Sequence, residues 1–404
     1  HRFDIEYRGS MRCIRQGMPW TGLQPDKDVG DALQACAGSS GLEAVTKMVL
    51  LGSAVRSLVS AQQERPYSCG DMIDVVSIVR GDLHDELKLR DSCPLPRLTG
   101  NAVSVVVETA REIVGLARDS LEQACIDACI NEEPLLKLAG RVPLQAILLA
   151  QRCHYDTLLE QAIDTGGNLS EVGQNVQRTV AAVDEELQRS SSERQTLALE
   201  QLRSVLCEIE SIVGSLVAAP SVEEVRRLWG DELHIRFCRE KHEFSCCCVG
   251  IPLPMAFEYN PVANLARLDH AKLFRRAFAN AFNPSSGKRE GPGVLVVSGL
   301  PDVATADLLR GTCALIGLIP VILKGSALTT GDTFWSRVAA ATKAFAVGSL
   351  PVLGVEDAGQ ADEEALVAAF TASGEHRFAL CIFSPGGKLQ QDGTTKLVEL
   401  KLES

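Results

Sequence analysis

The sequence predicts a mixed fold, in which a helix-rich N-terminal two-thirds precedes an α/β doubly wound core. Before about residue 240, apolar residues recur three and four positions apart, as at Val176, Val180, Val183 and Leu187. This spacing is typical of amphipathic helices. After residue 293, short apolar runs alternate with helical segments. Such alternation predicts parallel strands that are joined by helices.

The composition narrows the classes of function. The chain has 404 residues, of which 46% are hydrophobic and 23% charged, so it is not wholly disordered and suggests two or three domains. A net charge of -12 and an aromatic content of 5% argue against binding of nucleic acid or anionic membrane. No apolar run reaches the roughly 20 residues of a membrane helix. Because the sequence begins at His1, we expect a fragment or a processed chain.

Region 1–170 is expected to be mainly helical, without an assigned domain. Its first 40 residues look irregular, and 64–100 is interrupted by proline and glycine. Helices are expected over Gly41–Gln63, over Asn101–Ile130 as one or two helices, and from Pro134 to Leu149 with a break near Pro143.

Region 171–250 is expected to form a helical subdomain after a loop over 164–173. The Val176 series defines its first helix, and Leu199, Leu202, Leu206, Ile209 and Val213 define its second. Ser221 and Glu224 then form a capping box, which predicts a helix that continues to Phe237.

Region 251–404 is expected to form the α/β core, after an extended linker that contains Pro252, Pro254 and Pro261. Its expected strands are 294–298, 319–323, 350–355 and 378–383, with an edge strand over 395–403. Its expected helices are 264–282, 304–317, 333–346 and 362–373.

The 14 cysteines are interpreted mainly as free thiols in a reducing compartment. Cys125 and Cys129 lie four residues apart in a helical pattern, and core packing is the preferred interpretation. A second group shows a spacing that could place zinc ligands on one helical face, although a reduced thiol cluster is preferred. This group consists of Cys238, His242, Cys246, Cys247 and Cys248.

The loop after the first core strand is where an α/β nucleotide-binding protein holds phosphate. Here Pro301 removes a donor N–H, Asp302 adds negative charge, and Ala304 stands where a lysine is expected. These changes predict that the phosphate site is lost. The degenerate loop positions are Ser298, Gly299, Pro301, Ala304 and Thr305.

Glu356 and Asp357 follow the third core strand. Acidic residues at such a position can hold Mg²⁺ and orient water, but helix capping by Asp357 is the preferred interpretation. The sequence contains no Gly-x-Ser-x-Gly elbow and no His-Glu-x-x-His motif, and its seven histidines are scattered. We therefore expect no catalytic residues, no metal and no cofactor, with ATP or ADP bound with Mg²⁺ as the alternative.

Several segments together resemble the motor region of dynein heavy chains. The segment 350–366, followed by Ala372–Glu375, resembles the fourth AAA+ module, and 294–309 is similar to its phosphate-loop strand and helix. The segments 257–265 and 273–278 resemble the lead-in to that module. Upstream, 202–214 and 225–237 are similar to the lid helices of the third module, although Gly230 and Asp231 depart from the pattern.

This resemblance implies a phosphate-loop, AAA+-like core whose glycines would fall near Ser298, Pro301 and Val303, and whose lysine would fall on Ala304. It implies a degenerate structural or regulatory segment, whose partners are other AAA+ modules or subunits of a large complex and, indirectly, microtubules. The implied location is cytoplasmic or cytoskeletal, including the ciliary axoneme, with an organelle left open. Two alternatives remain: a helical scaffold subunit of an unrelated complex, and an active nucleotide-dependent enzyme with a divergent loop.

Overall fold

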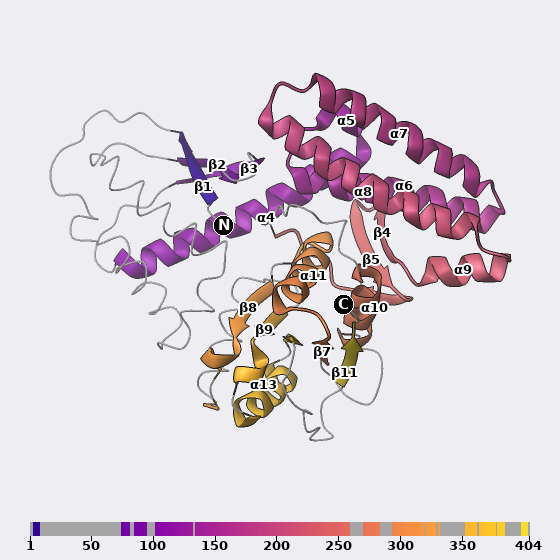
Figure 1. Cartoon of the computed structure of the whole chain (residues 1–404). Coiled ribbons are helices and arrows are strands. Elements are labelled where there is room, and N and C mark those ends of the chain that lie inside the picture. The colour runs from indigo at the N-terminus through magenta and orange to yellow at the C-terminus, as the bar shows by residue number, and fades with distance from the viewer. Residues whose placement is uncertain are drawn as a thin grey trace.

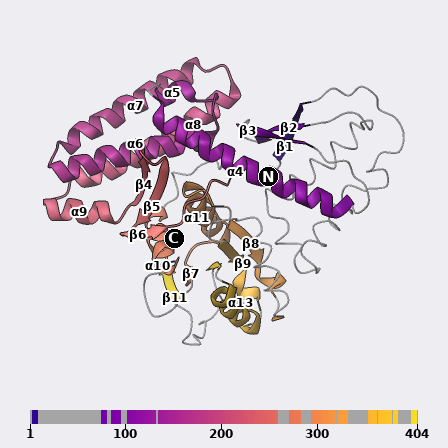
Figure 2. The same cartoon turned by 180° about the vertical axis from the view of Figure 1, so that it is seen from behind.

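The computed structural model has a small antiparallel sheet, a bundle of helices and a parallel α/β core (Figure 1). The long helix α4 runs from the small sheet into the bundle, and the core lies below both in the front and back views (Figure 2). The fold is therefore mixed helix and sheet, as the sequence predicts. The structure describes residues 3–8, 74–80, 85–94, 102–131, 134–258, 270–282, 293–318, 320–328, 330–331, 352–361, 363–376, 378–383 and 397–402.

The small sheet consists of β1 (Phe3–Arg8), β2 (Asp74–Arg80) and β3 (Asp85–Pro94), paired antiparallel in that order. The sequence interpretation missed these strands, because it treated 1–40 as irregular and 64–100 as broken. Pro94 lies at the end of β3, so it marks the end of a strand and does not interrupt one. The helix expected over Gly41–Gln63 lies outside the described residues.

The bundle begins with α4 (Ala102–Ile130), which is one continuous helix, followed by the short α5 (Leu135–Leu138). The expected break at Pro143 is confirmed, but α6 (Leu144–Thr165) continues past Leu149. Gly166 ends α6 in the left-handed conformation, and the side chain of Asn168 accepts the Ser170 N–H at 3.0 Å. The loop expected over 164–173 is therefore only 166–168.

Helices α7 (Leu169–Arg189) and α8 (Glu193–Val217) pack along each other, with Val176 and Val183 fully buried between the helices. Helix α9 (Val222–Gly230) begins as predicted, because the Ser221 hydroxyl accepts the Glu224 N–H at 3.2 Å. The Glu224 carboxylate, which was expected to complete the capping box, accepts from the Arg227 guanidinium at 2.6 Å.

The helix predicted through Phe237 ends at Gly230. The chain then forms the antiparallel strands β4 (Leu233–Cys238), β5 (Glu243–Cys248) and β6 (Ile251–Leu253). The helical subdomain is thus shorter than 171–250. Pro252, interpreted as part of a linker, lies in β6, which pairs with β5 at the edge of this sheet. An edge strand tolerates a residue that lacks an N–H donor.

The α/β core contains a parallel five-stranded sheet in the order β11-β7-β10-β9-β8. All five predicted strands are confirmed, including the edge strand. The sheet strands are β7 (Val294–Ser298), β8 (Pro320–Lys324), β9 (Val352–Glu356), β10 (Ala379–Phe383) and β11 (Leu397–Lys401). The described helices are α10 (Ala271–Phe282), α11 (Asp302–Leu315) and α13 (Glu363–His376). The helix predicted over 333–346 lies outside the described residues.

The hydrophobic interior has two main centres. One lies among α6, α7 and α8, and the other joins the β4–β6 sheet, α10 and the parallel sheet. The described helices include none that is both long and apolar enough to cross a membrane.

Candidate functional site

The predicted phosphate loop lies at the carboxyl end of β7. In the sheet β7 stands between β10 and β11, whereas the chain leaves β7 through α11 toward β8 at the far edge. The connection from β7 therefore runs toward one edge of the sheet, whereas the connection from β10 runs past β7 to β11 at the other edge. In open α/β sheets, ligands bind outside the carboxyl ends of strands at such a point.

Residues from the end of β11 close over the turn after β7. Gly299 has a φ of +95°, and a Cβ atom at this position would lie 1.7 Å from the Leu402 carbonyl oxygen. The Leu402 N–H donates to the Ser298 carbonyl at 2.8 Å. The single glycine of the loop therefore allows the end of β11 to approach the turn. The place where a phosphate would approach the Gly299 backbone is taken by protein.

Asp302 places a carboxylate at the first residue of α11, where the helix dipole favours an anion. This carboxylate accepts the backbone N–H of Asp357, at the end of β9, at 2.5 Å. The end of β9 and the N-terminus of α11 are thus joined by an anion that belongs to the chain. A bound phosphate would have to compete with this carboxylate.

The remaining loop positions make contacts within the helix. Pro301 immediately precedes α11, and Ala304 lies half-buried in its first turn. Thr305 is fully buried, and its hydroxyl donates to the Pro301 carbonyl at 3.3 Å. The Thr305 hydroxyl is therefore engaged by its own helix.

The acidic pair separates into two roles. Glu356 is the last residue of β9 and lies opposite Lys324 of β8 in the sheet register. Asp357 has a φ of +53° and precedes a short 3-10 turn, but its side chain makes no capping hydrogen bond. The capping interpretation of Asp357 is therefore wrong. A Cβ on Gly325 would lie 2.5 Å from the Asp357 carbonyl oxygen, so the ends of β8 and β9 also pack closely.

The possible zinc cluster lies on the β4–β5 hairpin and not on one helical face. Cys246 and Cys248 are buried in the core, whereas Cys247 lies between them on the opposite face of β5. Within the described part of the chain, no group of three or more His, Cys, Asp or Glu residues could hold a metal ion. Strand alternation explains the difference, because residues two apart share a face in a strand.

A buried ion network connects the bundle to the α/β core. On α6, Arg152 pairs with Asp156 at 3.1 Å, and its guanidinium also contacts Glu208 of α8 at 3.4 Å. Glu208 accepts in turn from Arg275 of α10 at 2.5 Å. Arg152 and Asp156 also bond to β4, through the Leu233 carbonyl and the Ile235 N–H, each at 2.8 Å.

The network shifts the acidities of its members in different directions. Burial raises the pKa of Asp156 to about 6, against the opposing effect of Arg152. Burial also acts to raise the pKa of Glu208, but Arg275 and Arg152 outweigh it and lower this pKa. Glu208 is therefore the anion that holds the two arginines together.

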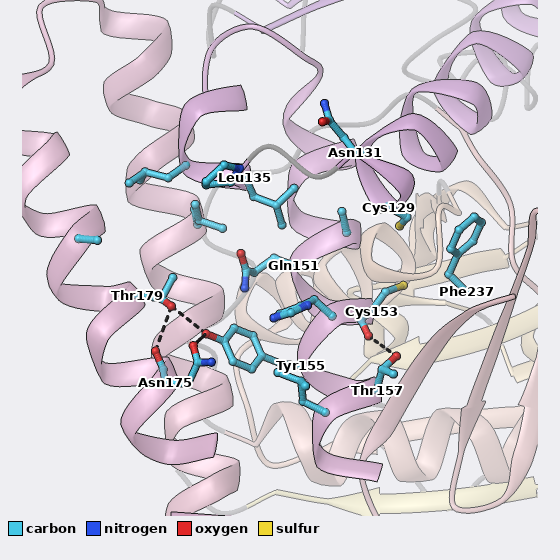
Figure 3. Close-up of a pocket in the computed structure, with 18 of the residues that line it drawn as sticks. Cys129, Asn131, Leu135, Gln151, Cys153, Tyr155, Thr157, Asn175, Thr179 and Phe237 are labelled. Carbon is cyan, nitrogen blue, oxygen red and sulfur yellow. Dashed lines mark hydrogen bonds between the residues drawn. The ribbon is translucent and has the colours of Figure 1, made fainter. Parts of the chain in front are cut away.

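A pocket of about 900 Å³ lies in the bundle (Figure 3). The Tyr155 hydroxyl reaches Thr179 at 2.9 Å and Asn175 at 3.3 Å on its α7 side. Cys129 of α4 and Cys153 of α6 line its other side, near Phe237 of β4 (Figure 3). The pocket is thus lined by paired polar groups on one side and by two thiols on the other.

Two of these features were missed or misread in the sequence. The sequence analysis did not identify Arg152, which lies among apolar residues of α6. A charged residue inside such an apolar run indicates a buried ion pair. Core packing is confirmed for Cys125, which is 1% exposed, whereas Cys129 is half-buried and lines the pocket. Comparison with protein-family models and with curated proteins gives no match for this chain.

Proposed function

We propose that this chain is a non-catalytic, structural or regulatory AAA+ segment of a dynein-type microtubule motor, or of an assembly protein derived from one. The α/β part from about residue 251 would be a degenerate fourth module, and the helices before it the lid of the preceding module. The observation that carries the proposal is the closed loop after β7. There Asp302 supplies an anion at the N-terminus of α11, and Leu402 covers Gly299.

The strand order supports an AAA+-like, doubly wound core. Numbered by position in the chain, the order is fifth, first, fourth, third, second, with β7 as the first strand. This order differs from the 3-2-1-4-5-6 order of Rossmann folds and from the 2-1-3-4-5 order of flavodoxin-like folds. A parallel sheet in this order is compatible with the doubly wound α/β core that the resemblance implies.

In this role the chain would transmit movement and perform no chemistry. The buried pairs from Arg152 through Glu208 to Arg275 tie α6 and α8 of the bundle to α10 of the core. A neighbouring module that moves one part would therefore move the other as a rigid body. The partners would be other modules or subunits of the ring, and microtubules only indirectly. The location would be cytoplasmic or axonemal.

Calorimetric titration of the whole chain with MgATP and with MgADP tests the loss of the nucleotide site. We expect no heat of binding up to millimolar nucleotide, both for the wild-type protein and for Asp302→Ala, because removing the carboxylate does not supply the missing lysine. Glu364→Ala, an exposed position on α13, is the matched control for Glu356→Ala. Micromolar binding that survives Asp302→Ala and Glu364→Ala but is lost in Glu356→Ala would overturn the proposal in favour of an active, divergent site.

The dynein part of the proposal needs a separate test. Immunoprecipitation of the native assembly, followed by mass spectrometry, is expected to recover subunits of a dynein motor with this chain. Recovery of a defined complex without any dynein subunit would reject the motor assignment and favour the helical scaffold.

A further inference from the structure

Two thiols face each other across the contact between α4 and α6. Cys129 and Cys153 both line the pocket, and Figure 3 shows their sulfur atoms facing each other beside Phe237. The two residues lie on separate helices that pack together. Of the described thiols, these two line the pocket, whereas Cys125, one turn earlier on α4, does not.

The environment distinguishes the two sulfurs. Cys129 is half-buried, and the guanidinium of Arg239 donates to its backbone carbonyl at 3.5 Å. The neighbouring Cys153 thiol, assisted by the positive charge of Arg239, lowers the pKa of Cys129 against the effect of burial. Cys153 is 4% exposed, and the neighbouring Cys129 together with burial raises its pKa. Cys129 is thus the better thiolate, and Cys153 is the thiol that remains protonated beside it.

We propose that Cys129 and Cys153 form a peroxide-oxidisable dithiol, in which Cys129 reacts first and Cys153 resolves it to a disulfide between α4 and α6. The pocket gives a hydroperoxide access to the Cys129 sulfur, since its volume of about 900 Å³ far exceeds that of a small peroxide. The proposed Cys129–Cys153 disulfide does not depend on the proposal that the chain belongs to a dynein-type motor.

The chemistry balances with one hydroperoxide. The Cys129 thiolate attacks the O–O bond, an S–O bond forms, and hydroxide or an alkoxide leaves. The Cys153 sulfur then attacks the sulfenic sulfur of Cys129, an S–S bond forms, and the S–O bond breaks. The Cys153 proton leaves with the departing hydroxide as water. The two thiols lose two electrons in total, and these reduce the peroxide.

Closure of the disulfide would link the C-terminal end of α4 covalently to the middle of α6. Helix α4 also contacts the small sheet, through β3, where the Arg90 N–H donates to the Ser120 hydroxyl at 2.9 Å. Oxidation would therefore fasten the part of the chain that carries this sheet to the bundle. Reduction by a dithiol would release it.

Peptide mapping of the whole chain after treatment with hydrogen peroxide tests the proposal. Trypsin places Cys129 in peptide 119–137 and Cys153 in peptide 153–178, which contains no other cysteine. We expect these two peptides to be joined in the oxidised protein, with the loss of two hydrogen masses and recovery of both peptides on reduction. Because peptide 119–137 also contains Cys125, the matched control is Cys125→Ala, in which the joined pair must persist.

Two further variants assign the order of reaction. Cys129→Ser should lose the linked peptides completely. Cys153→Ser should accumulate a sulfenic acid at Cys129, which dimedone labels. The peptide map of the wild-type protein tests the proposal directly, so a negative result cannot be attributed to misfolding of a variant. The proposal is overturned if both thiols stay reduced while the exposed Cys238 is oxidised, or if the link disappears in Cys125→Ala.

Discussion

His234 shows how burial sets the charge of a single residue. Its ring lies 4.1 Å from that of Trp229, and its buried Nδ1 atom has no hydrogen-bond partner among the described residues. Burial, followed by the nearby charges of Arg152 and Arg236, lowers the pKa of His234 to about 4. The folded protein therefore keeps this imidazole neutral at a pH where the unfolded chain would protonate it.

The His234 shift predicts a specific pH dependence of stability. Between about pH 6.5 and 4 the unfolded state binds more protons at this residue, so the free energy of unfolding falls as the pH falls. The full effect is about 3 kcal/mol, at about 1.4 kcal/mol per pKa unit. Urea unfolding at pH 7 and pH 4 should show that His234→Phe loses this dependence, since phenylalanine keeps an aromatic ring on Trp229.

The comparison must be made as a difference between the two proteins. Asp156, whose pKa is raised to about 6, acts in the opposite direction over the same pH range and is present in both. Wild-type and variant curves that run parallel from pH 7 to pH 4 would show that His234 does not carry the effect.

At the scale of elements, two glycines at positive φ are required for different reasons, one for its backbone conformation alone and the other also for close packing. Gly166, at the end of α6, has a φ of +66°, and a Cβ added there would meet no atom of the described chain within 4 Å. Gly299 has a φ of +95°, and its Cβ would collide with Leu402. The first glycine is needed only for its conformation, whereas the second also allows β11 to pair beside β7.

These two glycines form a matched pair of tests. Gly166→Ala should destabilise the protein by about 1 kcal/mol, the usual cost of a left-handed alanine. Gly299→Ala should cost at least about 3 kcal/mol, because the methyl group forces the end of β11 away from the turn in addition to the strain. The free energy of unfolding in urea measures both. Equal costs for the two substitutions would contradict the close contact between Gly299 and Leu402.

Elements also show where sequence patterns were sufficient. The core strands β7 to β10 are short apolar runs, and each was predicted within a few residues because a buried parallel strand needs apolar side chains on both faces. The edge strand β11 was predicted from its alternating pattern. The segment after α9 was misassigned, because Leu233 and Phe237 are four residues apart and fit a helix as well as a strand. Pairing with β5 decides between the two, and this partner is specified elsewhere in the chain.

At the scale of the whole molecule, Glu208 joins two parts of the fold. It bonds Arg152 on α6 and Arg275 on α10, and its side chain is 15% exposed. Removing a buried anion from between two arginines leaves positive charge uncompensated, which costs several kcal/mol. Glu208 of α8 is therefore one of the side chains that join the bundle to the core.

Glu208→Gln should destabilise both α6 and α10, because each of these helices carries an arginine that pairs with Glu208. Hydrogen exchange followed by mass spectrometry is expected to show that α6 and α10 lose amide protection together, by about 3 kcal/mol in opening free energy. Glu210→Gln is the matched control, because Glu210 lies two residues further on the same helix and accepts only the exposed hydrogen bond from Gln177 that the structure shows; it should change protection by less than about 0.5 kcal/mol. Loss of protection confined to α8 would contradict a connecting role.

The sequence by itself determined the order of helices and strands over most of the described chain, because hydrophobic periodicity depends on local neighbours. It also located the loop after β7 and the residues that depart from a phosphate site there. Only the tertiary structure decided which atoms close that loop, since Leu402 and Asp357 lie far from Gly299 and Asp302 along the chain. The same holds for the Arg152–Glu208–Arg275 network and for the Cys129–Cys153 pair. Each of these contacts joins groups that are distant along the chain but close in space, so no local sequence pattern encodes them.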